Sequence, residues 1–254
     1  MKPTGKVYLV GAGPGAPDLL TLRAADLLRL ADIVFHDALV HPDTLLLAGK
    51  AEKVAVGKRC GRLSTAQRFI NKRLVDAARA HAVVVRLKGG DPLLFGRAQE
   101  EIDALESAGI EYAIVPGITA ALAASAAVGT SMTRRGLSRN VTFVTPRTGA
   151  GEHGHDWAHS ALAADTCAIY MGVGEAGEIA ATLIARGASP ALPVVIVENA
   201  SLPGERRLPA RLADLGAVAG QGISGPAVIL LGEVYARAQT AESITAATKQ
   251  SHAA

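Results

Sequence analysis

Short apolar runs alternate with amphipathic segments along most of the chain. In the amphipathic segments the apolar residues recur every three to four positions, which predicts helices, while the short apolar runs predict strands. Strands that are apolar throughout are typical of parallel strands buried on both faces. We therefore expect an α/β fold, with strands near 6–10, 32–37, 52–56, 82–88 and 111–115 and helices near 19–31, 41–49, 64–81, 96–109 and 118–129.

A segment dense in glycine and polar residues, "PRTGAGEHGHDW", interrupts this rhythm after the apolar run "NVTFVT". Such a composition predicts a long loop or linker, so we place a domain boundary near Pro146. Further apolar and amphipathic segments follow, and the last residues are rich in Ala, Thr and Ser without periodicity. The sequence thus predicts an N-terminal α/β lobe over 1–145, a C-terminal α/β lobe over 146–238 and a disordered tail over 239–254.

The first apolar run ends in a glycine-rich turn, "VGAGPGAPD". Gly11, Gly13 and Ala16 match the relaxed spacing of a dinucleotide-binding turn, and Asp37 ends the next apolar run, where such a site holds a ribose hydroxyl. Pro14, however, removes a backbone N–H that a pyrophosphate would need. A nicotinamide-dependent dehydrogenase is therefore an alternative that rests on this turn alone.

A second glycine-rich turn lies in "VVVRLKGGDPLLFGR". An apolar strand runs directly into Gly89, Gly90 and Asp91, so the backbone can approach a ligand closely while a carboxylate stands at the strand end. A tight turn with a solvated aspartate explains the same residues equally well.

Six motifs in order, "VYLVGAGPGAPDLLTL", "VGKRCG", "VVVRLKGGDPLLFGRAQEE", "VPGITAA", "YMG" and "PVVIVEN", resemble the tetrapyrrole methylase family over roughly 6–234. The resemblance implies a two-lobed homodimer with a mostly parallel N-terminal sheet and a cleft between the lobes for S-adenosylmethionine. Since that cofactor has no pyrophosphate, the prolines of the opening turn remove nothing it needs. The implied reaction is methylation of uroporphyrinogen III at C2 and C7, through precorrin-1 to precorrin-2, for sirohaem, cobalamin or haem d1. S-adenosylhomocysteine is the other product.

The resemblance also implies roles for single residues. The candidate acid and base are Asp37 and Lys58, with Arg97 as a less conventional base, and Glu100 and Arg135 are expected to face the substrate. Guanidinium groups suit a substrate edged with carboxylates. The expected cofactor contacts are Pro14, Gly89, Gly90, Asp91, Leu94, Thr119, Ala120, Met171, Ala200 and Ala227.

Four positions depart from the family pattern. Arg134 and Arg147 stand where the family usually has the histidines of its Thr-His-Arg and Thr-Gly-His motifs, and Pro146 and Ala200 replace glycines. The lost histidines concern how the substrate is held, whereas the change at Ala200 is small if only the backbone touches the cofactor. Since the cofactor turns are shared more widely in the family than the substrate pocket, a methyltransferase acting on a later precorrin is the second alternative.

Composition narrows the classes of partner. A net charge of +3 and 4% aromatic residues suit an acidic small molecule better than nucleic acid. The uncharged stretch 114–132 contains Pro116, Gly117 and Gly129 with several Thr and Ser residues, and predicts no membrane span. The opening residues lack a secretory signal pattern, which predicts a cytoplasmic protein. Two distant cysteines and a glycine-rich histidine run, "GEHGHDWAH", predict no metal site.

Overall fold

The computed structural model describes residues 4–56, 63–149 and 154–238. They divide into two compact units, 1–120 and 121–254. The sequence placed the boundary near Pro146, but strand β6 (Val141–Val144) pairs with strand β7 (Thr166–Tyr170) and belongs to the second sheet. A polar loop marks the end of a strand; it does not tell which sheet that strand joins.

The first unit is built on a five-stranded parallel sheet in the order β3-β2-β4-β1-β5. All five strands lie where the apolar runs predicted them. The strands are β1 (Lys6–Gly11), β2 (Ile33–His36), β3 (Glu52–Ala55), β4 (Val83–Lys88) and β5 (Tyr112–Val115). The helices are η1 (Pro17–Leu19), α1 (Leu22–Leu30), α2 (Pro42–Leu46), α3 (Leu63–Ala80) and α4 (Ala98–Ser107).

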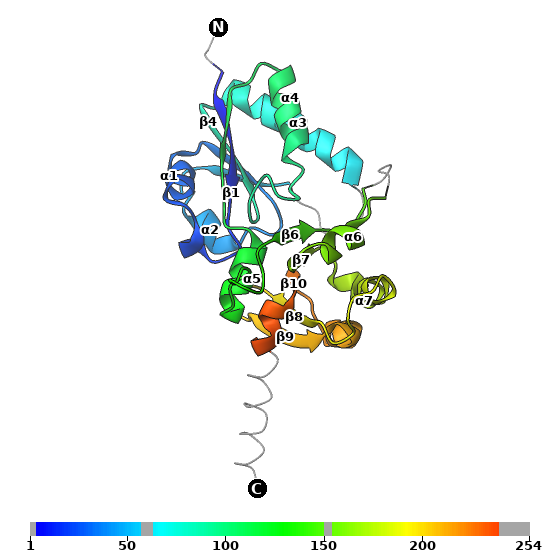
Figure 1. Cartoon of the computed structure of the whole chain (residues 1–254). Helices are drawn as coiled ribbons and strands as arrows, with labels where there is room; N and C mark the ends of the chain where they lie inside the picture. Colours follow the sequence, from blue (N-terminus) through cyan, green and yellow to red (C-terminus); the bar gives the residue numbers. More distant parts are fainter. Residues whose placement is uncertain (1–3, 57–62, 150–153, 239–254) are drawn as a thin grey trace, which may run out of the picture. The chain divides into compact units, whose positions relative to one another are not determined.

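Helices cover both faces of this sheet (Figure 1). On one face, Leu28 of α1 packs with Val10 and Val34, and on the other, Leu74 of α3 and Leu105 of α4 pack around the remaining strand residues. Adjacent strands β1 and β4 are therefore followed by helices on opposite faces. In open α/β sheets this arrangement leaves a crevice at the carboxyl ends of those strands, where ligands bind.

The second unit has a mixed sheet in the order β6-β7-β10-β8-β9. Only β6 and β7 are parallel, and the other pairs are antiparallel. Helix α6 follows the polar loop, a helix that the sequence analysis did not predict, although Asp156 caps it by accepting the His159 N–H at 3.1 Å. The elements are α5 (Ala120–Val128), β6, α6 (Trp157–Leu162), β7, η2 (Val173–Glu175), α7 (Ala176–Ala185), β8 (Pro193–Glu198), β9 (Arg206–Arg211), η3 (Leu212–Asp214), α8 (Leu215–Ala219), β10 (Ala227–Leu231) and η4 (Glu233–Tyr235).

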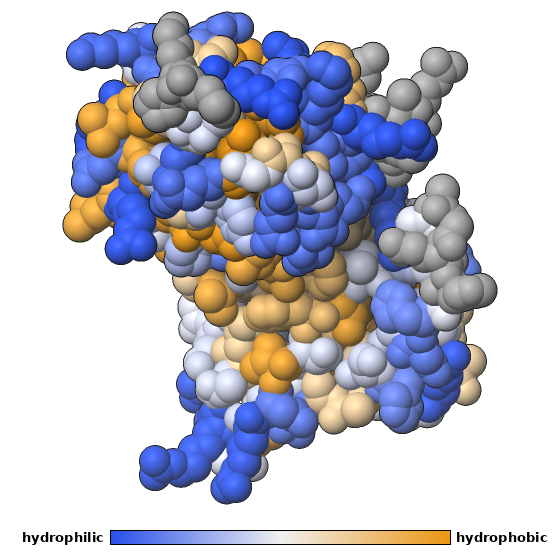
Figure 2. Space-filling model, turned by 90° about the horizontal axis from the view of Figure 1, so that it is seen from above, coloured by the Kyte–Doolittle hydropathy of each residue, from blue (hydrophilic) through white to orange (hydrophobic). Residues whose placement is uncertain are grey.

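The predicted fold class, α/β with a parallel N-terminal sheet and a second α/β unit, is confirmed. Within the ranges described above, no helix combines the length and the apolar character needed to cross a bilayer. Apolar side chains do reach the surface between charged ones, as the face in Figure 2 shows.

We expect Leu9→Ala to lower the free energy of unfolding by about 2–5 kcal/mol, because the fully buried Leu9 side chain lies in the central region of the first sheet and its removal leaves a cavity. Urea unfolding followed by circular dichroism measures the change. Leu22→Ala is the matched control: Leu22 is 87% exposed, and we expect a change within about 0.5 kcal/mol. Equal effects of the two substitutions would contradict this picture of the core.

Candidate functional site

The two glycine-rich turns of the first unit are joined by backbone hydrogen bonds. β1 and β4 are parallel neighbours, so the turns that follow them lie at the same edge of the sheet. The Gly13 N–H donates to the Gly90 carbonyl at 3.2 Å, and the Gly90 N–H donates back to the Gly13 carbonyl at 2.7 Å. Both glycines have positive φ, +71° and +68°, which a side chain disfavours. The sequence predicted each turn but not this pairing.

A third turn, after β5, packs directly against the other two. A Cβ on Gly117 would lie 2.3 Å from the Gly90 carbonyl oxygen and 2.9 Å from the Gly11 Cα. A Cβ on Gly11 would lie 2.6 Å from the Gly117 Cα. Neither position has room for a side chain, so glycine is required here by close backbone approach.

Asp91 holds two of these turns in place. Its Oδ2 accepts the Gly117 N–H at 3.0 Å, and its Oδ1 accepts the Leu93 N–H at 2.8 Å. Charge-assisted bonds of this kind are strong and directional. Asp91 therefore ties the turn after β4 to the turn after β5, where Thr119 and Ala120 lie.

This arrangement is unsuited to a pyrophosphate. A phosphate cradle needs several free backbone N–H groups. The N–H groups of Gly13 and Gly90 already donate to each other's carbonyl oxygens, and the Ala12 N–H donates to the Lys88 carbonyl at 2.7 Å. Pro14 has no N–H group. The edge instead offers close backbone approach, carbonyl oxygens and a carboxylate, which fit a ligand carrying hydroxyl and ammonium groups.

Asp37 follows β2 at the same edge and belongs to a chain of four charges. Its Oδ1 accepts from Arg86 Nη2 at 2.5 Å, Arg86 Nε donates to Glu101 Oε1 at 2.8 Å, and Lys88 Nζ donates to Glu101 Oε2 at 3.0 Å. The side chains of Arg86, Glu101 and Lys88 are 3%, 0% and 4% exposed, whereas that of Asp37 is 28% exposed. The chain therefore begins in the core and ends at Asp37.

The pKa values of the two cations shift in opposite directions. Burial disfavours the charged guanidinium of Arg86, but the carboxylates of Asp37 and Glu101 outweigh burial and raise its pKa. Burial, helped by the charge of Arg86, lowers the pKa of Lys88, although Glu101 opposes the shift. Arg86 is thus held firmly in its charged form.

Arg97 and Glu100 form a two-bond ion pair at the start of α4. Arg97 Nε and Nη2 donate to the two carboxylate oxygens of Glu100 at 2.7 and 2.9 Å. Arg97 has a positive φ of 54°, as does Phe95 with 53°, so the loop that carries Leu94 enters the helix through a strained backbone. Both side chains are more than 40% exposed, so the pair is accessible to a ligand.

The three predicted residues of the second unit lie together at one edge of its sheet. Met171 follows β7, Ala227 begins β10, and Ala200 follows β8, and the register pairs Val228 with Tyr170 and Ala227 with Glu198.

Two further contacts organise this edge. The Tyr170 hydroxyl accepts the Ala121 N–H of α5 at 3.0 Å. The buried Glu198 accepts the N–H groups of Ser224 and Gly225, at 2.8 and 2.6 Å, in the loop before β10. Neither Tyr170 nor Glu198 was singled out in the sequence as a positioning residue.

The sequence analysis named two further candidates, Arg135 and Lys58. Arg135 lies exposed in the turn closed by the backbone bridge between Arg134 and Ser138. Lys58 lies outside the described residues. No group of three or more potential metal ligands occurs within the described part of the chain.

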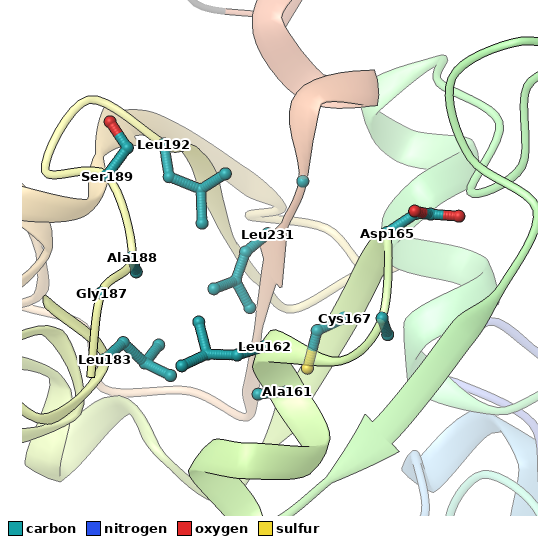
Figure 3. A pocket seen from close by; sticks show the side chains of 12 residues that line it. Ala161, Leu162, Asp165, Cys167, Leu183, Gly187, Ala188, Ser189, Leu192 and Leu231 are labelled. Carbon is teal, nitrogen blue, oxygen red and sulfur yellow. The ribbon is translucent and has the colours of Figure 1, made fainter.

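A cavity of about 260 Å³ lies at the opposite edge of the second sheet (Figure 3). Leu231 pairs with Cys167 there, three positions along β10 from the Val228–Tyr170 pair. Burial raises the pKa of Cys167 to about 12, so its thiol is unreactive at neutral pH. The cavity is lined by residues such as Leu162, Asp165, Leu183 and Ser189 and is separate from the edge with Met171.

Residues 6–216 match the model of the Tetrapyrrole (Corrin/Porphyrin) Methylases. The chain belongs to this family. The N–H groups of Gly13 and Gly90 are already hydrogen-bonded to each other's carbonyl oxygens. For this reason, and because the chain belongs to this family, the opening turn no longer supports a dehydrogenase. The family also confirms the resemblance drawn from the six motifs.

Individual relatives of this tetrapyrrole methylase are similar over most of its length. It is 45% identical over 232 residues to the uroporphyrinogen-III C-methyltransferase of Pseudomonas aeruginosa, covering 91% of this chain and 94% of that protein. It is 46% identical over 231 residues to the siroheme synthase of Zymomonas mobilis, covering 91% of this chain but only 49% of that protein. The chain thus spans about half the length of the siroheme synthases it matches.

The same fold occurs in the uroporphyrin-III C-methyl transferase of Thermus thermophilus. The native form matches with a TM-score of 0.80 and 43% identity, covering 91% of this chain and 98% of that chain. The form complexed with S-adenyl homocysteine matches with a TM-score of 0.78 and 42% identity over the same shares.

The sequence analysis missed the buried part of the site. Arg86, Lys88 and Glu101 were not selected, although a signal was present: two cations interrupt the otherwise apolar strand "VVVRLK", and buried charges require partners. Gly117 was missed as well. Its need for glycine depends on the distance to Gly11 and Gly90, which no local pattern encodes.

We expect Gly11→Ala to lower the free energy of unfolding by about 1–3 kcal/mol, because the added methyl group would overlap the Gly117 backbone. Denaturant unfolding measures the loss. Gly49→Ala is the matched control in the same unit, since its Cβ would meet only the Leu46 carbonyl oxygen at 4.0 Å. A Gly11→Ala protein as stable as the Gly49→Ala protein would show that the three turns are not closely packed.

Proposed function

We propose that this tetrapyrrole methylase transfers methyl groups from S-adenosylmethionine to uroporphyrinogen III at C2 and C7. The products are precorrin-2, formed through precorrin-1, and S-adenosylhomocysteine. The observation that carries the proposal is the match over nearly the whole length of a uroporphyrinogen-III C-methyltransferase, in a chain whose glycine turns suit a ligand without phosphate. The complex of the Thermus relative with S-adenyl homocysteine supports the choice of methyl donor.

The proposed cofactor contacts are the residues that the family resemblance implied. In the first unit, Pro14, Gly89, Gly90, Asp91, Leu94, Thr119 and Ala120 follow neighbouring strand ends, and in the second unit, Met171, Ala200 and Ala227 share one edge. S-adenosylmethionine supplies an electrophilic methyl group on a sulfonium. Glycines allow the ligand to approach the backbone, and the carbonyl oxygens there accept hydrogen bonds from ammonium or hydroxyl groups. Asp91 contributes chiefly by fixing the turns, since both of its oxygens already accept backbone N–H groups.

Arg97 and Arg135 are the proposed contacts for the substrate carboxylates. Both side chains are exposed cations, and a guanidinium binds a carboxylate through two parallel hydrogen bonds. Glu100 already forms such a pair with Arg97 and holds the guanidinium in one orientation. Because a guanidinium stays protonated in proteins, we assign Arg97 to substrate binding and catalysis by charge rather than to proton removal.

Asp37 is the proposed base for the proton that must leave after the new carbon–carbon bond forms. It is a partly exposed carboxylate at the same sheet edge as the glycine turns, and Arg86 occupies one of its oxygens. The other oxygen is then available to accept a proton. Lys58, the proposed acid, lies outside the described residues, and its role stays a prediction, as does the cytoplasmic location.

The direct test is anaerobic transfer of labelled methyl groups from S-adenosylmethionine to uroporphyrinogen III, with the products separated by mass. We expect two methyl groups per substrate molecule.

The Asp91→Ala substitution should weaken cofactor binding about 10- to 100-fold, because the turns after β4 and β5 lose the carboxylate that joins them. Asp26→Ala, in an exposed ion pair on α1, is the control and should bind normally.

Two outcomes of this assay would change the assignment. Absence of both transfer and cofactor binding in the wild-type protein would refute the proposed function. Preferred methylation of a later precorrin would favour the second candidate, which the arginines at 134 and 147 motivate, since each replaces a family histidine.

We also propose that the protein is a homodimer, as the family resemblance implies. Large apolar side chains on its surface support this, among them Leu39, Leu46 and Leu122, which are 65%, 74% and 51% exposed. Apolar surface of this kind is commonly buried when two copies associate. Light scattering on the eluted protein should give twice the mass of the 26.0 kDa chain, and a mass of one chain at micromolar concentration would exclude a stable dimer.

A further inference from the structure

The buried charges of the first unit are arranged in strict alternation. Asp37 forms an ion pair with Arg86, Arg86 bridges Asp37 and Glu101, and Glu101 bridges Arg86 and Lys88. Gln67 of α3 adds a weaker bond to Glu101 at 3.4 Å. Two cations and two anions cancel, so the cluster carries no net charge into the core.

Fold stability alone is a weak reason for such a cluster. Buried ion pairs lose solvation on folding, and well-packed apolar side chains of similar size often serve stability as well or better. The strand that carries Arg86 and Lys88 has apolar neighbours at Val84, Val85 and Leu87, all fully buried, so an apolar pair would fit its pattern. A role beyond fold stability would account for the cluster.

The two ends of the cluster differ. The side chains of Lys88, Glu101 and Arg86 are almost fully buried. Each nitrogen of the Arg86 guanidinium has a partner: Nη2 donates to Asp37, Nε donates to Glu101, and Nη1 donates to the Leu87 carbonyl at 3.2 Å. Asp37 alone is partly exposed. A planar guanidinium held by three acceptors cannot turn freely, so it presents Nη2 to Asp37 in one direction.

We propose that Arg86 is a positioning residue for Asp37 in the methyl-transfer reaction, with Glu101 and Lys88 holding Arg86 from behind. The inference rests on the proposed function, in which Asp37 receives a proton. Arg86 occupies Asp37 Oδ1, and Oδ2 is the oxygen that would take the proton. Glu101 sets the tilt of the guanidinium, and Lys88 balances the second oxygen of Glu101. None of these three side chains touches the substrate.

Lys88 also supports the loop that carries other candidate residues. A Cβ on Gly96 would lie 3.1 Å from Lys88 Cε and 2.6 Å from the Pro92 carbonyl oxygen, so the loop closes tightly over the lysine stem. Glu101 lies on α4, directly after Glu100. The same buried cluster thus ties Asp37, which follows β2, to the loop and helix that carry Leu94, Arg97 and Glu100.

The test is a double-mutant cycle with Arg86→Lys and Asp37→Asn, read out as kcat and KM for methyl transfer. Lysine keeps the buried positive charge but cannot bridge Asp37 and Glu101 as a guanidinium does. In the wild-type background we expect Arg86→Lys to lower kcat about 10- to 100-fold, with KM for S-adenosylmethionine changed less than about 2-fold. In the Asp37→Asn background the same substitution should change kcat less than about 3-fold, because its target is gone.

Two controls separate positioning from general damage. Arg29→Lys makes the same substitution in an exposed pair with Asp26 and should leave kcat unchanged. Leu74→Ala destabilises the same unit from the core and should leave kcat unchanged below the unfolding temperature. Equal effects of Arg86→Lys in both backgrounds, or an Asp37→Asn protein with full activity, would overturn the proposal.

A structural measurement keeps the inference testable apart from activity. The crystal structure of the Arg86→Lys protein should show the Asp37 carboxyl group displaced by more than about 0.5 Å while the β2 backbone stays in place. An unmoved carboxyl group would overturn the positioning role. If the wild-type protein transfers no methyl group, the proposed function fails, and the position of this carboxyl group still decides whether Arg86 orients Asp37.

Discussion

The reciprocal backbone hydrogen bonds between Gly13 and Gly90 are the constraint on which the first unit's site depends. They join the turns after two parallel strands into one surface, and Gly117 packs against that surface closely enough to exclude any side chain. Because the amides are spent in this pairing, the edge loses the donors that a phosphate would require. The chemistry left for a ligand is that of carbonyl oxygens, a carboxylate and bare backbone, which is consistent with the family to which the chain belongs.

Carboxylates act in this protein as organisers of loops more than as isolated charges. Asp91 joins two turns in the first unit, and Glu198 holds the loop before β10 in the second by accepting two N–H groups. An ionised carboxylate with several backbone donors is a strong and directional anchor. In both units, a buried or half-buried acid therefore determines the shape of the edge where the proposed ligand contacts lie.

The charge cluster of Asp37, Arg86, Glu101 and Lys88 extends this principle into the core. Leaving one member without its partner would strand a buried charge, which is far more costly than the pair is worth in stability. The four charged groups consequently depend on one another. Because each is held by an oppositely charged neighbour, the cluster restricts the orientation of every member. Asp37 is the member that remains accessible, and the enclosed members restrict where its carboxylate can lie.

The sequence by itself determined the order of strands and helices in the first unit and two of its glycine-rich strand ends. Periodicity is local, and the tight turn at Gly89 and Gly90 leaves a local signature, so both can be read without tertiary information. The sequence also indicated Asp37 and Arg97 through family resemblance, but it did not predict helix α6 or the strand order of the second sheet. Short segments after polar loops carry too few periods to distinguish a helix from a loop.

Only the tertiary structure decided which groups meet. Arg86 is 49 residues from Asp37 along the chain, and Asp91 is 26 residues from Gly117, so their bonds follow from strand order and not from any local pattern. It also decided that the glycine turns use their own amides and that Met171, Ala200 and Ala227 share one edge. The physical reason is that hydrogen bonds and ion pairs depend on distances of a few ångströms, which are set by how the sheets bring distant segments side by side.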